Sequence, residues 1–356
     1  MSAPGKRRSW RRKLLFSCVP LLVLMLLGEI GARVWRGMHG LTPFGTSNYR
    51  AVRVDFMRRG YPAQHDERLG FVPRAGFRSS DNQWGVLVSI DERSLRNNGT
   101  PWPQGPGVLA VGDSFTFGDQ VGDADTWPSR LQEAIDKPVW NGGVFAYSFA
   151  QSVLRAEQLL PTLPVETLLV SLIPDDLRRC EFGRSILEIP WYQLVDGELV
   201  LQNVPVPDPA ESPLARQHVR HLLGYSALLD AIFAKAVPQW WVGHDRGPAP
   251  HARGVGVQIG TRLLERLAAT CRERGVRLLL VLQSVEHPEE WELVESAQLL
   301  AAAETLGVQC LDLQAEFARM AAADPSLFER FYDLHMTAAG NAWVAERIAA
   351  ELQKGR

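Results

Sequence analysis

The chain has 356 residues, and 38 Lys and Arg against 40 Asp and Glu give it a net charge of -2. A nucleic-acid-binding protein normally carries a clearly basic face, so this balance argues against nucleic acid as a partner. A hydrophobic fraction of 46% with 22% charged residues is ordinary for a globular protein with a sizeable core.

The N-terminus has the layout of an export signal. Six of the eight residues 6–13 are Lys or Arg, and an apolar stretch, 14–27, follows them. Because the basic end stays in the cytoplasm, the rest of the chain would lie on the extracytoplasmic, periplasmic side. The stretch is shorter than the roughly 20 residues that span a bilayer, but it lengthens if Glu29 and Arg33 lie at the far interface. We expect an uncleaved single-pass anchor in residues 1–36, with a cleaved signal peptide and a buried helix as alternatives.

Residues 37–105 form a segment rich in Arg, Gly, Pro and Asn. Short β-like pieces occur in it, such as 86–90. We interpret the segment as an irregular, β-containing lead-in rather than as a separate enzyme domain.

The pattern changes at residue 106, where short apolar runs begin to alternate with amphipathic stretches. The expected strands are 108–111, 139–140, 167–173, 276–282 and 308–311, and the expected helices are 127–136, 151–160, 258–274, 293–306 and 337–352. This alternation predicts an α/β domain over 106–356, with a parallel sheet covered by helices on both faces.

The alternation lapses over about 180–257, which is rich in Pro and Gly. We interpret this region as an insertion over the functional edge of the sheet. It is either a lid or substrate-choosing element, or a loop with no such role.

A serine between two glycines follows the first expected strand of this domain. Residues 112–118 read Gly-Asp-Ser-Phe-Thr-Phe-Gly, with Ser114 in third place. Ligands of parallel sheets bind beyond the carboxyl ends of the strands, and the glycines permit a sharp turn that lifts the hydroxyl to that edge. If a helix begins there, its N–H groups point at whatever the hydroxyl attacks. Ser114 is therefore either a nucleophile or an ordinary helix-capping serine.

An aspartate and a histidine, Asp333 and His335, stand just before the last expected helix. Serine is a poor nucleophile until a base takes its proton, and histidine is the usual base near neutral pH. The histidine in turn needs a carboxylate that fixes its tautomer and offsets the charge it acquires. Asp333 and His335 supply both groups, so with Ser114 they make a candidate catalytic triad.

These segments resemble the first and last sequence blocks of the SGNH hydrolases, the GDSL esterase and lipase superfamily. The resemblance covers roughly residues 105–353, and the lead-in resembles that of membrane-anchored bacterial members. It implies a three-layer, flavodoxin-like α/β/α fold. It also implies that Ser114 is the nucleophile, His335 the base and Asp333 the orienting carboxylate.

The resemblance further implies an oxyanion hole, in which two positions depart from the family pattern. The family uses the serine N–H, a glycine N–H and an asparagine side chain; here these positions hold Ser114, Ala146 and Asp175. A backbone donor survives a change from glycine to alanine if the dihedral angles allow it. An ionised Asp175 cannot donate and would repel an oxyanion, whereas burial beside Asp176 would favour a protonated Asp175 that donates.

Asp175 therefore leaves several outcomes open. The site is slow, or it uses a neutral Asp175, or it has lost hydrolysis; Asp175 is otherwise a cap on the next helix. The sequence predicts an extracytoplasmic serine esterase that needs no metal or organic cofactor and acts on an ester or acylated-glycan substrate. The alternatives are an O-acetyltransferase or deacetylase acting on cell-surface polysaccharide, and a non-catalytic binding protein with a degenerate oxyanion hole.

Overall fold

A computed structural model describes residues 7–35, 62–82, 84–184, 187–208, 223, 225–237 and 251–354. The chain divides into two units, each described by itself below. One unit comprises residues 1–53 and 212–244, and the other comprises 54–211 and 245–356.

The larger unit is built on a five-stranded sheet in which every neighbouring pair of strands is parallel. The strand order is β11-β10-β7-β5-β6. The strands are β5 (Gly107–Val111), β6 (Val139–Asn141), β7 (Val165–Leu172), β10 (Arg277–Leu282) and β11 (Gln309–Asp312). Each expected strand is present, with its ends shifted by no more than two residues.

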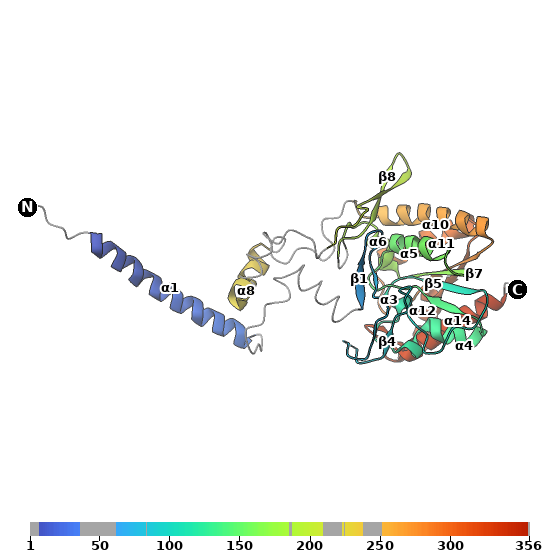
Figure 1. Cartoon of the computed structure of the whole chain (residues 1–356), viewed down its shortest axis with the longest axis horizontal. Helices are drawn as coiled ribbons and strands as arrows, with labels where there is room; N and C mark the ends of the chain where they lie inside the picture. The colour runs from blue at the N-terminus through green and yellow to red at the C-terminus, as the bar shows by residue number, and fades with distance from the viewer. Residues whose placement is uncertain are drawn as a thin grey trace, which may run out of the picture. The chain divides into compact units, whose positions relative to one another are not determined.

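Helices cover both faces of this sheet, so the predicted three-layer α/β/α fold is confirmed (Figure 1). Successive residues of a strand point to opposite faces. Leu109 and Val111 of β5 therefore join one hydrophobic cluster, and Val108 and Ala110 join the other. The first cluster lies under α5 (Phe149–Leu159), α10 (Val255–Arg274) and α11 (Glu290–Thr305), and the second under α4 (Trp127–Ile135), α12 (Leu313–Ala323) and α14 (Ala338–Lys354).

Local capping signals place several helix ends where the sequence predicts them. The Thr126 side chain accepts a hydrogen bond from the backbone of Ser129 and begins α4. Gly275 ends α10 in the left-handed conformation, with φ 66°. The helix α12 and the short α13 (Leu327–Phe331) that follows it, both in the described part of the chain, have no counterpart among the expected helices.

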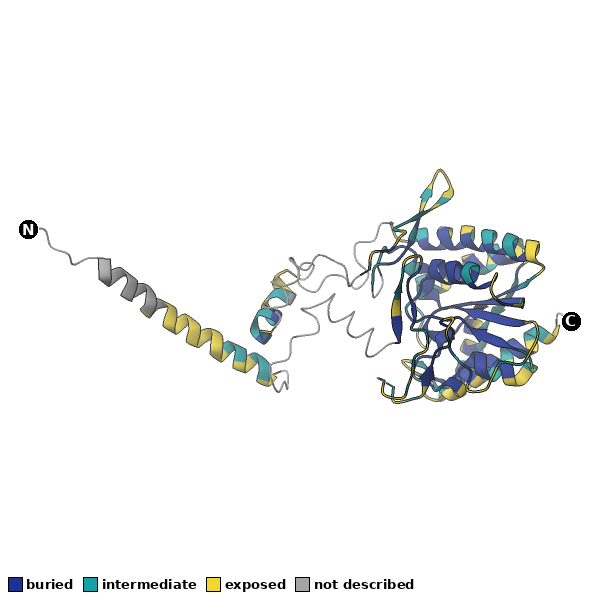
Figure 2. Cartoon of the chain, viewed as in Figure 1, coloured by how far each residue is buried: buried dark blue, intermediate teal, exposed yellow. Residues whose placement is uncertain are grey.

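The lead-in packs against the sheet domain within the same unit. Its described part forms two antiparallel pairs, and Leu69, Phe71 and Ile90 belong to the cluster that covers one face of the sheet. The pairs are β1 (Ala63–Asp66) with β2 (Gly70–Pro73), and β3 (Arg78–Ser79) with β4 (Val88–Ser89). Figure 2 shows the sheet buried between its two layers of helices.

The insertion is described in part. It contributes an antiparallel hairpin of β8 (Trp191–Val195) and β9 (Glu198–Gln202) to the larger unit, and α8 (Ala227–Ala236) to the smaller one. Its remaining residues, 185–186, 209–222, 224 and 238–250, lie outside the described part of the chain. Cys180 and Cys271 are buried free thiols, Cys310 is half-buried and free, and no disulfide joins them.

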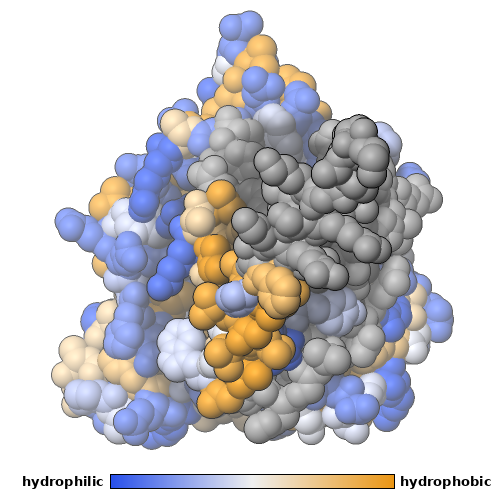
Figure 3. Space-filling model, turned by 90° about the vertical axis from the view of Figure 1, so that its left-hand side faces the viewer, coloured by the Kyte–Doolittle hydropathy of each residue, from blue (hydrophilic) through white to orange (hydrophobic). Residues whose placement is uncertain are grey.

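In the smaller unit, α1 (Arg7–Trp35) is long and apolar enough to cross a membrane. Its segment Cys18–Trp35 has a mean hydropathy of 1.7 and is not buried in the structure. A signal sequence near the N-terminus has the same properties. Large apolar side chains are exposed along α1, and hydrophobic atoms, coloured orange, gather on the surface that faces the viewer in Figure 3.

The C-terminal part of α1 contacts the beginning of α8 through hydrogen bonds. The Glu29 carboxylate accepts hydrogen bonds from the backbone N–H groups of Ala227 (2.9 Å) and Leu228 (3.0 Å) and from the Ser226 hydroxyl (2.7 Å). Arg33 donates to Glu29 at 2.6 Å. Glu29 thus caps α8 from another segment of the chain, at the place where a negative charge is most favourable to a helix.

Candidate active site

Ser114 lies at the carboxyl edge of the sheet, in the first turn after β5. It begins the short helix α3 (Ser114–Phe117), and the Asp113 carboxylate caps this helix by accepting from the Phe115 N–H at 2.9 Å. Gly112 is required there because a Cβ at that position would lie 2.5 Å from the Ser171 carbonyl oxygen. Strand, close-packed glycine and helix therefore fix the place of the Ser114 hydroxyl.

His335 is brought to Ser114 from the other end of the domain. The His335 Nε2 atom lies 2.9 Å from the Ser114 Oγ atom, a hydrogen-bond distance. The backbone N–H of His335 donates to Gln120 Oε1 at 2.8 Å, which ties the histidine to the loop after α3. Burial lowers the pKa of His335 below its usual value, while the charge of Asp113 opposes this shift. A neutral imidazole is the form that can accept the serine proton.

The Asp333 carboxylate is exposed and makes no hydrogen bond or ion pair with the imidazole within the described structure. The two residues nevertheless face each other in the pairing of β12 (Tyr332–Asp333) with β13 (His335–Met336). Directly opposed residues of an antiparallel pair carry their Cβ atoms about 5 Å apart on one face. The pairing therefore brings the two backbones close together, and the role of Asp333 remains a prediction.

Two other carboxylates lie beside the Ser114–His335 pair, and the sequence did not single them out. Asp119 is buried, and its Oδ2 atom is 3.8 Å from His335 Nε2. Asp113 is also buried, and its Oδ2 atom is 3.4 Å from Ser114 Oγ. Both would stabilise a positive charge on the imidazole. Asp113 belongs to the serine motif itself, so its place in the sequence was a usable signal.

The guanidinium of Arg179, at the end of α6 (Pro174–Arg179), contacts several carboxylates near Ser114. Its Nη1 atom lies 2.6 Å from Asp176 Oδ1 and 3.4 Å from Asp113 Oδ2, and it donates to the Tyr147 carbonyl at 2.9 Å. Burial opposes the charge on Arg179, but the surrounding carboxylates together raise its pKa. Burial, and then the charge of Asp113, raise the pKa of Asp176 well above its usual value.

Asp175 also pairs with this cation, since its Oδ2 atom lies 3.0 Å from Arg179 Nε. A guanidinium at that distance favours a charged carboxylate, which is not the protonated donor considered from the sequence. The role of helix cap belongs to the next residue, because Asp176 accepts from the Ile173 N–H at 3.1 Å. Arg179 partly offsets the negative charge that Asp175 would direct at an oxyanion.

Ala146 has φ 57°, in the left-handed region that favours glycine. The backbone at this position therefore takes the conformation that a glycine would adopt freely, although the side chain is alanine. Ser114 and Ala146 both stay candidate backbone donors. The Ser114 N–H makes no hydrogen bond to another described residue.

Arg96 of the lead-in holds the loop that follows α3. It is 0% exposed, and its guanidinium donates to the carbonyls of Phe117 (2.8 Å), Gly118 (2.5 Å) and Val121 (2.6 Å). It also pairs with Asp123 at 3.2 Å. These contacts fix the loop that carries Asp119 and Gln120. No spacing in the sequence predicted this role.

A pocket of about 300 Å³ adjoins His335 and Asp333. Gln120, Asp125 and Met336 also line it. Among the described residues, no group of three His, Cys, Asp or Glu is arranged to hold a metal ion. The described site consists of a serine and an imidazole in contact, with buried carboxylates near them.

No family model matches the chain, and a search of curated proteins finds no relative. Solved structures do match. One is a protein from Desulfitobacterium hafniense DCB-2 assigned to the G-D-S-L family of lipolytic proteins, with 12% identity, 68% of this chain and 97% of that chain covered, and a TM-score of 0.39. Another is TesA, with 12% identity and a TM-score of 0.41; the match covers 69% of this chain and 98% of that chain.

A third similar structure is a catalytic mutant of an acetylxylan esterase from Geobacillus stearothermophilus. The identity is 12%, the match covers 70% of this chain and 95% of that chain, and the TM-score is 0.38. At such identities a likeness concerns the fold, so function is argued from the residues of this chain.

Proposed function

We propose that this protein is a membrane-anchored serine hydrolase that cleaves carboxylic esters outside the cytoplasm. The observation that carries the proposal is the 2.9 Å contact between Ser114 Oγ and His335 Nε2. A nucleophile and a base within hydrogen-bond reach, at the carboxyl edge of a parallel sheet, are the minimum apparatus for acyl transfer.

In the proposed reaction the Ser114 hydroxyl attacks the ester carbonyl while His335 Nε2 takes its proton. The tetrahedral intermediate collapses to an acyl-serine, and the imidazolium returns the proton to the departing alcohol. Water then attacks the acyl-serine, with His335 again as base, and releases the acid. The N–H groups of Ser114 and Ala146 would stabilise the oxyanion.

Two buried acidic groups would stabilise the charge that develops on His335. Asp113 favours the imidazolium, and Asp119 lies 3.8 Å from Nε2. We assign the orienting role to Asp333, which would act at Nδ1 because Nε2 is occupied by Ser114.

The first experiment measures hydrolysis of 4-nitrophenyl acetate by the full-length protein in detergent. We expect turnover by the wild type and a loss of at least about 10³-fold in kcat for Ser114→Ala and His335→Ala, since triad members act as a unit. Ser326→Ala removes an exposed hydroxyl and serves as the matched control. Equal turnover by wild type and Ser114→Ala would reject the assignment, as would failure of Ser114 to react with a fluorophosphonate.

A second experiment compares Asp333→Asn with Asp119→Asn. Loss of the orienting carboxylate of a triad costs about 10⁴-fold in kcat, so we expect a loss of that order for Asp333→Asn and a smaller one for Asp119→Asn. The opposite ranking would transfer the orienting role to Asp119.

The location is tested by fusing alkaline phosphatase, which is active only after export, to the C-terminus. Basic residues at 6–13 and the apolar segment Cys18–Trp35 lead us to expect an active fusion that stays with the membrane fraction. An inactive fusion would reverse the orientation, and activity released as soluble protein would indicate a cleaved signal peptide.

A further inference from the structure

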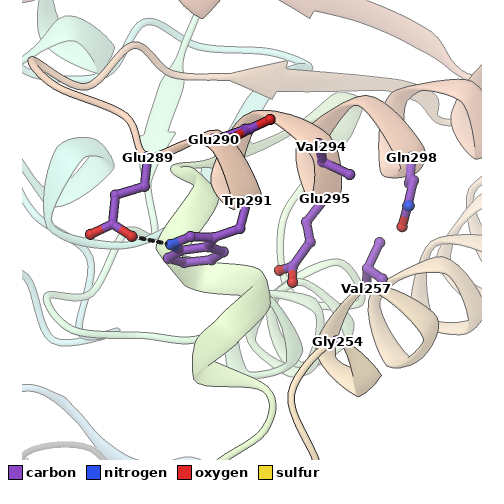
Figure 4. A pocket seen from close by; sticks show the side chains of 8 residues that line it. All are labelled: Gly254, Val257, Glu289, Glu290, Trp291, Val294, Glu295 and Gln298. Carbon is purple, nitrogen blue, oxygen red and sulfur yellow. Dashed lines mark hydrogen bonds between the residues drawn. The ribbon is translucent and has the colours of Figure 1, made fainter.

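A second pocket, of about 680 Å³, lies between the beginnings of α10 and α11 (Figure 4). Its size is within the range of about 300–1,000 Å³ that is usual for small-molecule sites. Val257, Val294 and Trp291 supply apolar surface. α11 follows the carboxyl end of β10, so this pocket lies at the same edge of the sheet as Ser114.

Glu295 of α11 is aimed into this pocket. Figure 4 shows its side chain extending from α11 toward Val257 and Gly254 of the facing segment. The residue is 9% exposed, and its buried Oε2 atom has no hydrogen-bond partner within the described structure. A buried carboxylate oxygen without a donor is costly, so a ligand that donates to it would be strongly favoured.

The charges around the pocket disfavour an anionic ligand. Glu289, Glu290 and Glu295 line it, and no basic residue is among its described lining residues. The N-terminus of a helix attracts anions, but at α10 this position is occupied by the Glu181 carboxylate. Glu181 accepts hydrogen bonds from the N–H groups of Gly254 (2.5 Å) and Gly256 (3.3 Å).

The basic groups nearby are directed at an aromatic ring. The guanidinium groups of Arg253 and Arg178 lie 4.4 Å and 5.2 Å from the centre of the Trp291 ring. The described carboxylates are not clustered as ligands of a metal ion. The pocket therefore combines net negative charge, apolar walls and one buried acceptor.

We propose that this pocket binds a primary ammonium group carried on a compact apolar skeleton, with Glu295 accepting a hydrogen bond from the ammonium. Val257 and Val294 would contact the carbon skeleton, and Glu289 and Glu290 would add attraction at the mouth. This binding goes beyond the proposed ester hydrolysis and does not depend on it.

The electrostatic surroundings of Glu295 give this proposal a pH signature. Burial raises the pKa of Glu295, and Glu181 and Glu292 act in the same sense, while Arg253 and Arg178 oppose it. Because its pKa is raised, Glu295 in the empty pocket stays protonated to a higher pH than an exposed glutamate would. Ammonium binding should strengthen as pH rises above 4.5 through that pKa, and weaken where the amine itself loses its proton.

The test uses saturation-transfer difference NMR on the full-length protein in a non-ionic detergent, with cyclohexylammonium and its neutral counterpart cyclohexanol as probes. We expect cyclohexylammonium to bind, and cyclohexanol to bind at least about tenfold more weakly, because a charge-assisted hydrogen bond is lost. Glu295→Gln should weaken cyclohexylammonium binding by a similar factor. Glu304→Gln changes an exposed glutamate on the last turn of the same helix and is the matched control.

A second variant keeps the test decisive if Glu295→Gln fails to fold. Val294 is 51% exposed on the wall of the pocket, so Val294→Trp should fill the pocket without disturbing the core, and should abolish binding. Equal binding of the two probes, no binding of cyclohexylammonium, or undiminished binding in the folded variants would each overturn the proposal.

Discussion

Replacing Arg96 tests whether the lead-in is an integral part of the site. Arg96→Met keeps the unbranched apolar stem of the side chain but removes every donor. The carbonyls of Phe117, Gly118 and Val121 then lose hydrogen bonds that contribute about 3 kcal/mol together, at about 1 kcal/mol each. The loss of one partner of the buried pair with Asp123 costs about 3–5 kcal/mol more. We expect the free energy of unfolding to fall by about 6 kcal/mol or more.

Arg96→Lys gives a milder version of the same perturbation. The lysine keeps the charge opposite Asp123 but cannot reach three carbonyls at once, so we expect a loss of about 2 kcal/mol. Guanidinium chloride unfolding, followed by circular dichroism, measures both variants. Arg93→Met is the control, because Arg93 is 44% exposed and its ion pair with Asp91 is worth less than about 1 kcal/mol. If Arg96→Met were no more destabilising than Arg93→Met, the reasoning would be refuted.

Three further predictions concern the site itself. Because burial lowers the pKa of His335, kcat/KM for an aryl ester should fall on the acid side with a midpoint below 6.5 and stay level above it; a midpoint at or above 6.5 would contradict this. Asp175→Asn removes a negative charge and offers a donor to the oxyanion, so kcat should rise about tenfold or more in the same assay, and an unchanged or lower rate would count against that role. Ala146→Gly relieves a backbone at φ 57° and should raise the melting temperature by roughly 2–4 °C, for about 1 kcal/mol, without loss of turnover; a lower melting temperature would show that the left-handed backbone is not strained.

The parts of the fold that the sequence predicted are those with local signals. Alternating apolar runs marked the strands, while Thr126 and Gly275 marked helix ends that the structure has. α12 was missed because it starts without a turn: Asp312 is the last residue of β11 and also the cap of this helix. Because no glycine or proline separates them, the sequence does not show where the strand ends and the helix begins.

The site was predictable where the chemistry sits in short motifs. Ser114 and His335 were picked out by the residues around them, although 221 positions separate them. Arg96 and Arg179 were not. The partners of Arg96 are mainly backbone carbonyls of a distant loop, and Arg179 joins Asp113 and the Tyr147 carbonyl of other elements to Asp175 and Asp176 of its own helix. Only the spacing of Arg179 from Asp175 and Asp176 is visible in the sequence, because the other contacts depend on which groups the fold brings together.

The polypeptide leaves the smaller unit once and later comes back to it, where Glu29 caps the start of α8. Residues 54–211 belong to the larger unit, and 212–244 return to the unit that contains α1. A protease that cut once between α1 and β1 would sever the direct connection, but α8 would still hold α1 through Glu29 and the packing of Leu228 on Gly28. Release of the larger unit would then require a second cut or the loss of that contact.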